Sequence, residues 1–91
     1  MIMYCHRVAK RSADVTDFLI MYRESVVQKG DSVTDVVAHS STLNVQTRIN
    51  GDREVIVTMG GGQSGTVELI NITIKTARGL IKKDCIRVQV G

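Results

Sequence analysis

The sequence predicts a small all-β protein, and three observations lead to that prediction. Apolar and polar residues alternate over several short stretches, most clearly at Ile70, Ile72 and Ile74, whose side chains would project from one face of a strand. Turn-like sequences separate these stretches at intervals of roughly ten residues. Hydrophobic residues make up 43% of the chain but aromatic residues only 3%, so we expect a core of valine, isoleucine and leucine.

The chain of 91 residues is short enough to form one domain with a thin core. Residues 1–13 pass from an apolar stretch to a polar group, and we expect them to form an N-terminal arm or edge strand. Residues 14–91 would form the folded domain.

The segment 14–28 has two interpretations, which periodicity alone does not separate. A helix would place one apolar set on a single face: Val15, Phe18, Leu19, Tyr22 and Val26. A strand would place a different set on a single face: Phe18, Ile20 and Tyr22.

Turns divide the middle of the chain into short strands. The sequence Gln-Lys-Gly-Asp-Ser at 28–32 predicts the first turn, because glycine permits a left-handed backbone there. The Asn-Gly pair at 50–51 predicts a hairpin turn. The strands expected around these turns cover residues 33–38, 43–47 and 54–59.

The last third of the chain predicts a glycine-rich loop followed by a hairpin. Glycines recur at 60–65, and the strand with the alternating isoleucines follows them. A turn covers 76–79, and apolar and polar residues alternate again over 80–90. We expect six residues of this hairpin to line the core: Ile70, Ile72, Ile74, Ile86, Val88 and Val90. About six or seven short strands without alternating helices indicate an Ig-like β-sandwich.

The charge pattern gives little support for nucleic-acid binding. The net charge is +3, and the basic residues are scattered along the chain. The last hairpin carries five basic residues: Lys75, Arg78, Lys82, Lys83 and Arg87. They would form either a solvated face or a salt-sensitive contact for an acidic protein or nucleic acid. Without stacking aromatic residues nearby, we favour the solvated face.

The sequence selects no catalytic, cofactor or metal site. The loop at 60–65 lacks the lysine of a phosphate-binding loop, and a strand rather than a helix follows it. His6 and His39 are far apart, and neither has a cysteine or carboxylate at ligand or catalytic spacing. The aspartates lie mostly at turns, where they commonly bind the local backbone. The glycosylation sequon at 71–73 falls inside a predicted strand, and we interpret it as coincidence.

Cys5 and Cys85 lie near opposite ends of the chain and form no CxxC pair. They would approach each other if the terminal strands pair, but we expect both to be reduced and buried. The first residues do not have the pattern of a secretory signal, and no apolar run reaches transmembrane length. We therefore expect a protein made inside a cell without membrane insertion.

The order of the turn motifs resembles that of the small phage fibre-tail adaptor family over about residues 14–90. The family's "GD-(T/S)-I/V" turn is similar to Gly30-Asp31-Ser32-Val33. Its "GG-x-x-G-T" loop is similar to Gly61-Gly62-Gln63-Ser64-Gly65-Thr66. Its "I-T-T-S-x-G-R" hairpin is similar to Ile70-Asn71-Ile72-Thr73-Ile74-Lys75-Thr76-Ala77-Arg78-Gly79. The chain departs from the family in having Ser12 for a proline, Tyr22 for a tryptophan and Leu80 for a basic residue.

The resemblance implies a non-enzymatic virion protein, made in the host cytoplasm, that joins the tail or neck of a phage to its fibres in several copies. It also implies that residues 14–28 are at least partly a strand, with Phe18, Ile20 and Tyr22 inward. Two alternatives remain open, a capsid cement or decoration protein and a free Ig-like module that binds carbohydrate or protein.

We expect this fold to dock its neighbours through exposed strand edges and loops, because an open sheet edge accepts a partner strand. The arm is the best candidate for strand exchange, and the glycine-rich loop permits close backbone approach. The expected interface residues are Met1, Ile2, Met3, Tyr4, Gly60, Gly61, Gly62 and Gln63.

Overall fold

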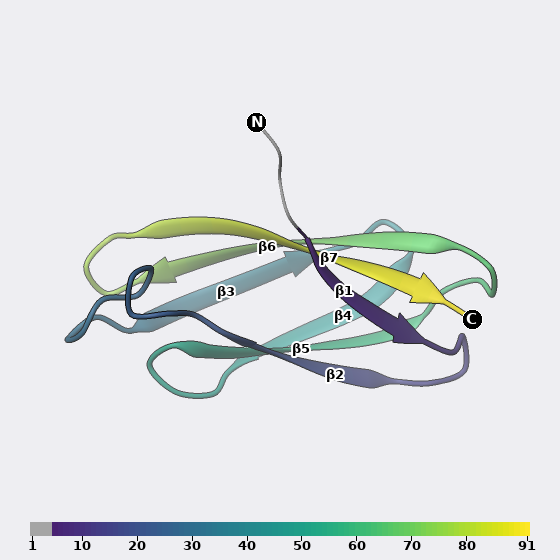
Figure 1. The fold of residues 1–91 in the computed structure, drawn as a ribbon, viewed down its shortest axis with the longest axis horizontal. Coiled ribbons are helices and arrows are strands. Elements are labelled where there is room, and N and C mark those ends of the chain that lie inside the picture. Colours follow the sequence, from purple (N-terminus) through teal and green to yellow (C-terminus); the bar gives the residue numbers. More distant parts are fainter. Residues whose placement is uncertain (1–4) are drawn as a thin grey trace.

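The computed structural model describes residues 5–91, and within them seven strands form two sheets that pack face to face (Figure 1). The strands are β1 His6–Lys10, β2 Thr16–Met21, β3 Val33–His39, β4 Leu43–Ile49, β5 Glu54–Gly61, β6 Val67–Thr76 and β7 Ile81–Val90. One sheet has the order β1-β7-β6-β3, and the other has the order β2-β5-β4. The predicted all-β sandwich is confirmed, and no helix occurs in the described part of the chain.

The hairpin of β6 and β7 forms the centre of the four-stranded sheet. The two strands pair antiparallel with Ile70 opposite Ile86. Their alternate side chains point between the sheets, where all six residues that we predicted for the core are almost fully buried: Ile70, Ile72, Ile74, Ile86, Val88 and Val90. The alternate positions face outward and hold polar and charged residues together with the exposed Val67, Leu69 and Ile81.

The segment that the sequence left open between helix and strand contains β2. This strand pairs antiparallel with β5, and Phe18, Ile20 and Tyr22 point toward the core as the strand interpretation required. The chain then leaves the sheet, and Val27 buries its side chain completely at the end of the core. Arg53 fixes this excursion, since its Nε donates a hydrogen bond to the Val27 carbonyl at 2.8 Å.

The hairpin of β4 and β5 is longer than its sequence predicts. The pairing runs without interruption from Ile49 opposite Val55 to Leu43 opposite Gly61. The Asn-Gly turn at 50–51 is confirmed, but the strands absorb Ile49 at one end and Gly61 at the other. Turn composition alone could not show this, because backbone pairing with a neighbour decides where a strand ends.

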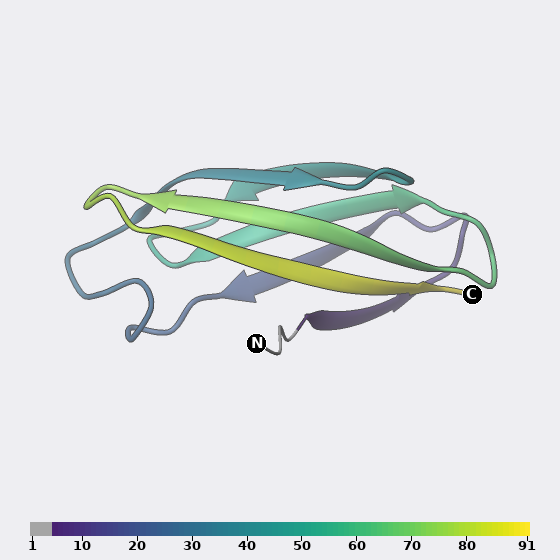
Figure 2. The ribbon, with the colours of Figure 1, turned by 90° about the horizontal axis from the view of Figure 1, so that it is seen from above.

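The first strand lies parallel to the last, at the edge of the four-stranded sheet, so β1 and β7 run side by side in Figures 1 and 2. His6 pairs with Ile86, and continuing this register by one residue brings Cys5 beside Cys85 with their Cα atoms 4.7 Å apart. The two cysteines form a disulfide. Our prediction of reduced cysteines is therefore wrong, because the parallel pairing of the terminal strands is a long-range contact that spacing in the sequence does not reveal.

Candidate docking surfaces

The glycine-rich loop after β5 is fixed by packing at one end of the sandwich. Gly62 has a φ of +94°, and a Cβ at this position would lie 2.8 Å from Leu43 Cδ2 and 3.0 Å from Val90 Cγ2. Glycine is therefore required both by the backbone conformation and by the side chains beneath it. Beyond this point Gln63 is exposed, and Gly65 donates a backbone hydrogen bond to Val90 at 2.8 Å.

A buried lysine connects this loop to the end of β1. Lys10 is only 6% exposed, and its Nζ donates to the carbonyl of Gly61 at 2.6 Å and to that of Arg11 at 2.6 Å. A buried ammonium group requires such partners, because burial without them is costly. The edge strand β1 and the glycine-rich loop consequently form one continuous, rigidly connected border of the molecule. Sequence reasoning missed this role of Lys10, which has no recognisable motif.

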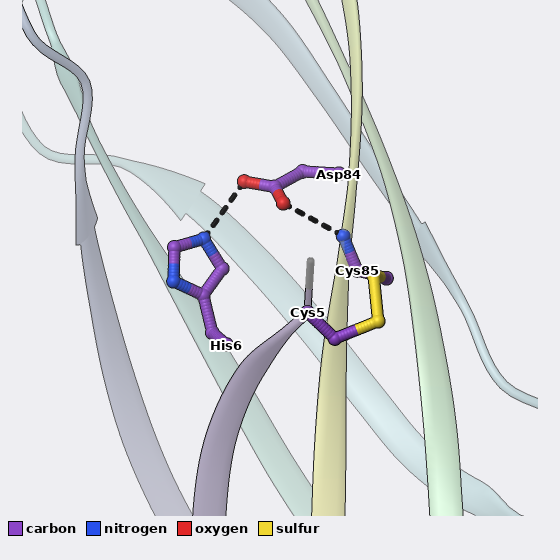
Figure 3. A network of polar contacts seen from close by, with 4 residues as sticks. All are labelled: Cys5, His6, Asp84 and Cys85. Atoms are coloured by element: carbon purple, nitrogen blue, oxygen red, sulfur yellow. Dashed lines mark hydrogen bonds and ion pairs between the residues drawn. A yellow bond between two sulfur atoms is a disulfide. The ribbon is translucent and has the colours of Figure 1, made fainter. Parts of the chain in front are cut away.

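The other end of β1 is fixed by a polar cluster on the core side and by the disulfide on the outer side (Figure 3). His6 Nε2 lies 2.8 Å from Asp84 Oδ2, and the same carboxylate accepts a hydrogen bond from the Cys85 amide. Cys5 and His6 point to opposite faces of β1, as their adjacency predicts. The His6–Asp84 pair was not predicted, since 78 residues separate its members.

Tyr22 extends toward this cluster from the three-stranded sheet. Burial, followed by the nearby Asp84 carboxylate, raises the pKa of the Tyr22 phenol well above its usual value. The hydroxyl is buried, but among the described residues it has no partner at hydrogen-bonding geometry. The only cysteines of the chain form the disulfide, so this cluster contains no thiol nucleophile.

Asp31 holds two turns together at the opposite end of the sandwich. Its Oδ1 accepts hydrogen bonds from the amides of Ser32 at 2.9 Å and Arg78 at 3.0 Å. Burial alone would raise the pKa of the Asp31 carboxyl, but the Thr76 hydroxyl and these two amides lower it below its usual value. The role predicted for turn aspartates, binding the local backbone, is confirmed here.

The outer face of the four-stranded sheet is basic. Its outward positions hold four cations, on β1, β6 and β7: Arg7, Lys75, Lys83 and Arg87. One carboxylate, Asp35 on β3, faces the same way and is paired in register with Lys75. The basic group that the sequence predicted on the last hairpin therefore does not share one face. Lys82 lies at an inward-facing position of β7, and Arg78 lies in the turn. Arg7 on β1 faces outward with the others instead.

The outer face of the three-stranded sheet has a different character. Exposed apolar side chains occupy the β2 side, with Leu19 47% and Met21 66% exposed, and Val15 precedes them at 73%. Leu19 is paired in register with Ile56 on β5. Exposed apolar side chains also occur on the outer face of the other sheet, at Val37, Val67, Leu69 and Ile81. The two outer faces therefore differ in charge, since the face of the three-stranded sheet carries Asp17, Glu54 and Arg48.

Of the expected interface residues, Met1 to Tyr4 lie outside the described part of the chain. Gly60 and Gly61 end β5, where they pair with Asn44 and Leu43 and Gly60 is buried, and only Gly62 and Gln63 lie in the loop that follows. Within residues 5–91, no group of three or more histidine, cysteine, aspartate or glutamate side chains has the arrangement of a metal site. No helix in that part of the chain is long and apolar enough to cross a membrane.

A family model matches residues 10–89, which is most of the chain, and its family is described as podophage GP4 fiber-tail adaptor protein gp77. The chain belongs to this family. The resemblance inferred from the turn motifs is therefore confirmed. A comparison with curated proteins gives no match.

Membership defines the chain as a structural adaptor of a podophage virion, in contact with tail and fibre proteins, and not as an enzyme. The surfaces described above are accordingly considered as docking surfaces for proteins.

Proposed function

We propose that the chain joins tail and fibre proteins in several copies per particle, and that it docks them through the border formed by β1 and the glycine-rich loop. The sandwich itself acts as a rigid spacer, held by a continuous apolar core and by the disulfide at its edge. Residues 1–4, which precede β1 in the sequence, take part in the contact, either by strand addition or by packing against a neighbouring copy.

The observation that carries this proposal is the open edge of β1. This strand pairs with β7 on one side, and it is terminal in the sheet order on the other. An edge strand presents unpaired backbone N–H and C=O groups, to which a partner strand adds without requiring a particular side chain. The Lys10–Gly61 hydrogen bond places the loop at the end of this edge, so one partner can contact both.

The two unlike outer faces also support a bridging role. A protein that joins two different partners needs two surfaces that discriminate between them, and a difference in surface charge provides such discrimination. The basic face and the outer face of the three-stranded sheet, which carries Asp17, Glu54 and Arg48, lie on opposite sides of the sandwich. Two partners bound to them would therefore not collide.

Electron cryomicroscopy of the parent phage particle tests the proposal directly. We expect density for the chain in a multi-copy ring at the tail or neck, touching the fibre roots. Density spread over the capsid shell would favour a cement or decoration protein, and absence from the particle would favour a free binding module. Either result would contradict the proposed role.

Matched variants test the docking border. Gln63→Trp places a bulky side chain on the loop after β5, and Asp52→Trp places the same side chain on the exposed turn before β5. We expect only Gln63→Trp to reduce incorporation into particles. Deletion of residues 1–4 should also reduce incorporation without lowering the unfolding temperature, since the deletion leaves Cys5 and β1 in place. If the Gln63→Trp protein and the protein that lacks residues 1–4 are both incorporated normally, the docking border is refuted.

A further inference from the structure

Two arginines occupy paired positions on the basic face, on the edge strand and its neighbour. Arg7 on β1 and Arg87 on β7 are direct register partners, and both are exposed on the outer face. Like charges at directly opposed positions destabilise a sheet. Among the described residues the ion pairs are His6–Asp84 and Arg48–Asp17, so neither arginine is compensated by one. Two like charges that destabilise the sheet and have no ion pair to offset them are the kind of feature that is found at functional sites.

Apolar side chains continue the same rows across the sheet. Arg87 is paired in register with Leu69, and Gln89 with Val67, on β6. Leu69 is 54% exposed and Val67 48% exposed, although both are large aliphatic residues. An open hollow of about 520 Å³ lies over this part of the sheet, lined by Arg7, Val8, Ala9, Val67, Arg87 and Gln89.

We propose that this surface, which we call the arginine hollow, binds an acidic segment of a partner protein, with a carboxylate held between Arg7 and Arg87 and an aliphatic side chain against Leu69 and Val67. The inference rests on the proposed function and adds the chemistry of the partner to it. Guanidinium groups match carboxylates in planar, bidentate geometry, which makes arginine the preferred residue for such contacts.

The charges around the hollow favour an acidic occupant. Of the remaining cations on the outer face, Lys75 lies opposite Asp35, but Lys83 is paired in register with the neutral Thr73. The carboxylates of the neighbouring strands are turned away: Glu68 accepts a hydrogen bond from Thr42, and Asp84 contacts His6. The face therefore has an excess of positive charge at Arg7, Lys83 and Arg87.

A protein segment fits this surface better than a nucleic acid or a second copy. The aliphatic side chains beside the arginines match an apolar residue, whereas single-stranded nucleic acid is bound by aromatic stacking, and Phe18 and Tyr22 point into the core. A second copy that docked the same basic face here would bring like charges together, which is unfavourable at an interface, whereas an acidic segment neutralises them.

The test measures binding of the purified chain to phage particles assembled without it. The Arg7→Gln/Arg87→Gln variant should bind at least about tenfold more weakly than the natural chain, because a desolvated carboxylate loses its charged partners. The control variant Lys75→Gln/Lys82→Gln removes the same number of positive charges and should bind normally. The unfolding temperature of the arginine variant should not fall, since the substitution removes a repulsion.

The outcomes separate the inference from the function on which it rests. If the natural chain itself does not bind the particles, the adaptor arrangement proposed above fails. If the natural chain and the arginine variant bind equally, only the arginine hollow fails. Binding of labelled single- or double-stranded DNA that the arginine substitutions abolish would overturn the assignment to a protein. Light scattering that shows these substitutions dissociating an oligomer would identify a second copy as the occupant and overturn it as well.

Discussion

Removing the Cys5–Cys85 disulfide should cost this small domain a large part of its stability. The bond closes a loop with a sequence separation of 80. In the chain-entropy model, a cross-link of that span restricts the unfolded chain enough to contribute about 4.5 kcal/mol at 25 °C. The total stability of a domain is typically about 5–15 kcal/mol, so reduction should remove about 30% of it or more.

Urea unfolding with and without a phosphine reductant measures this contribution, because reduction leaves both sulfur atoms in place. The Cys5→Ala/Cys85→Ala variant provides the control, since its unfolding midpoint should not respond to the reductant. We expect hydrogen exchange in β1 to accelerate most, because this edge strand has a single neighbour in its sheet. A loss of less than about 1 kcal/mol on reduction would refute the entropic argument.

Three further substitutions test the ends of the sandwich. Gly62→Ala should lower the free energy of unfolding by about 2–4 kcal/mol, because it combines backbone strain with a clash against Leu43. Gly65→Ala, which has open space around its Cβ position, should lower it by only about 1–2 kcal/mol. Equal losses would contradict the packing role of Gly62. Lys10→Met should cost about 1–3 kcal/mol in urea unfolding, because it leaves the partly buried carbonyls of Gly61 and Arg11 without their donor. An unchanged midpoint would refute that role. Because folding lowers the pKa of Asp31, the carboxylate stabilises the fold above about pH 4, and this contribution disappears as the pH falls through the lowered pKa. Asp31→Asn should therefore make the unfolding temperature less sensitive to acid. Identical acid profiles of the two proteins would contradict this.

The sequence was sufficient for the features that depend on local pattern. The alternation of Ile70, Ile72 and Ile74 identified the buried face of β6, because a strand facing a core must repeat every second residue. The Asn-Gly pair located the turn between β4 and β5 for a similarly local reason, its tolerance of positive φ. In segment 14–28 two periodicities competed, and only pairing with β5 selects the strand.

The features that sequence reasoning missed all depend on contacts between distant segments. Cys5 meets Cys85, and His6 meets Asp84, because β1 pairs in parallel with β7. Parallel pairing between the two ends of a chain leaves no turn signal, since a long crossover separates the strands. The same pairing brings Arg7 into a group that the sequence placed only on the last hairpin.

Reduction of the disulfide should weaken docking at the arginine hollow even where the fold survives. Cys5 and Arg7 project from the same face of β1, two residues apart, and Cys85 and Arg87 do so from β7. The cross-link therefore holds β1 in the register that places the two arginines together. Cellular cytosol keeps most thiols reduced, so the hollow would be fully formed only after the bond is oxidised.

Binding to particles assembled without the chain, with and without reductant, tests this coupling at a temperature where circular dichroism shows an intact sandwich. The natural chain should lose affinity on reduction. The Arg7→Gln/Arg87→Gln variant should lose little further affinity on reduction, because it already lacks the contact that the disulfide helps to position. The effects of reduction and of the substitutions are therefore not additive. If the reduced natural chain binds as tightly as the oxidised one, the pairing of β1 with β7 alone is sufficient to hold the arginines in place, and the disulfide serves stability only.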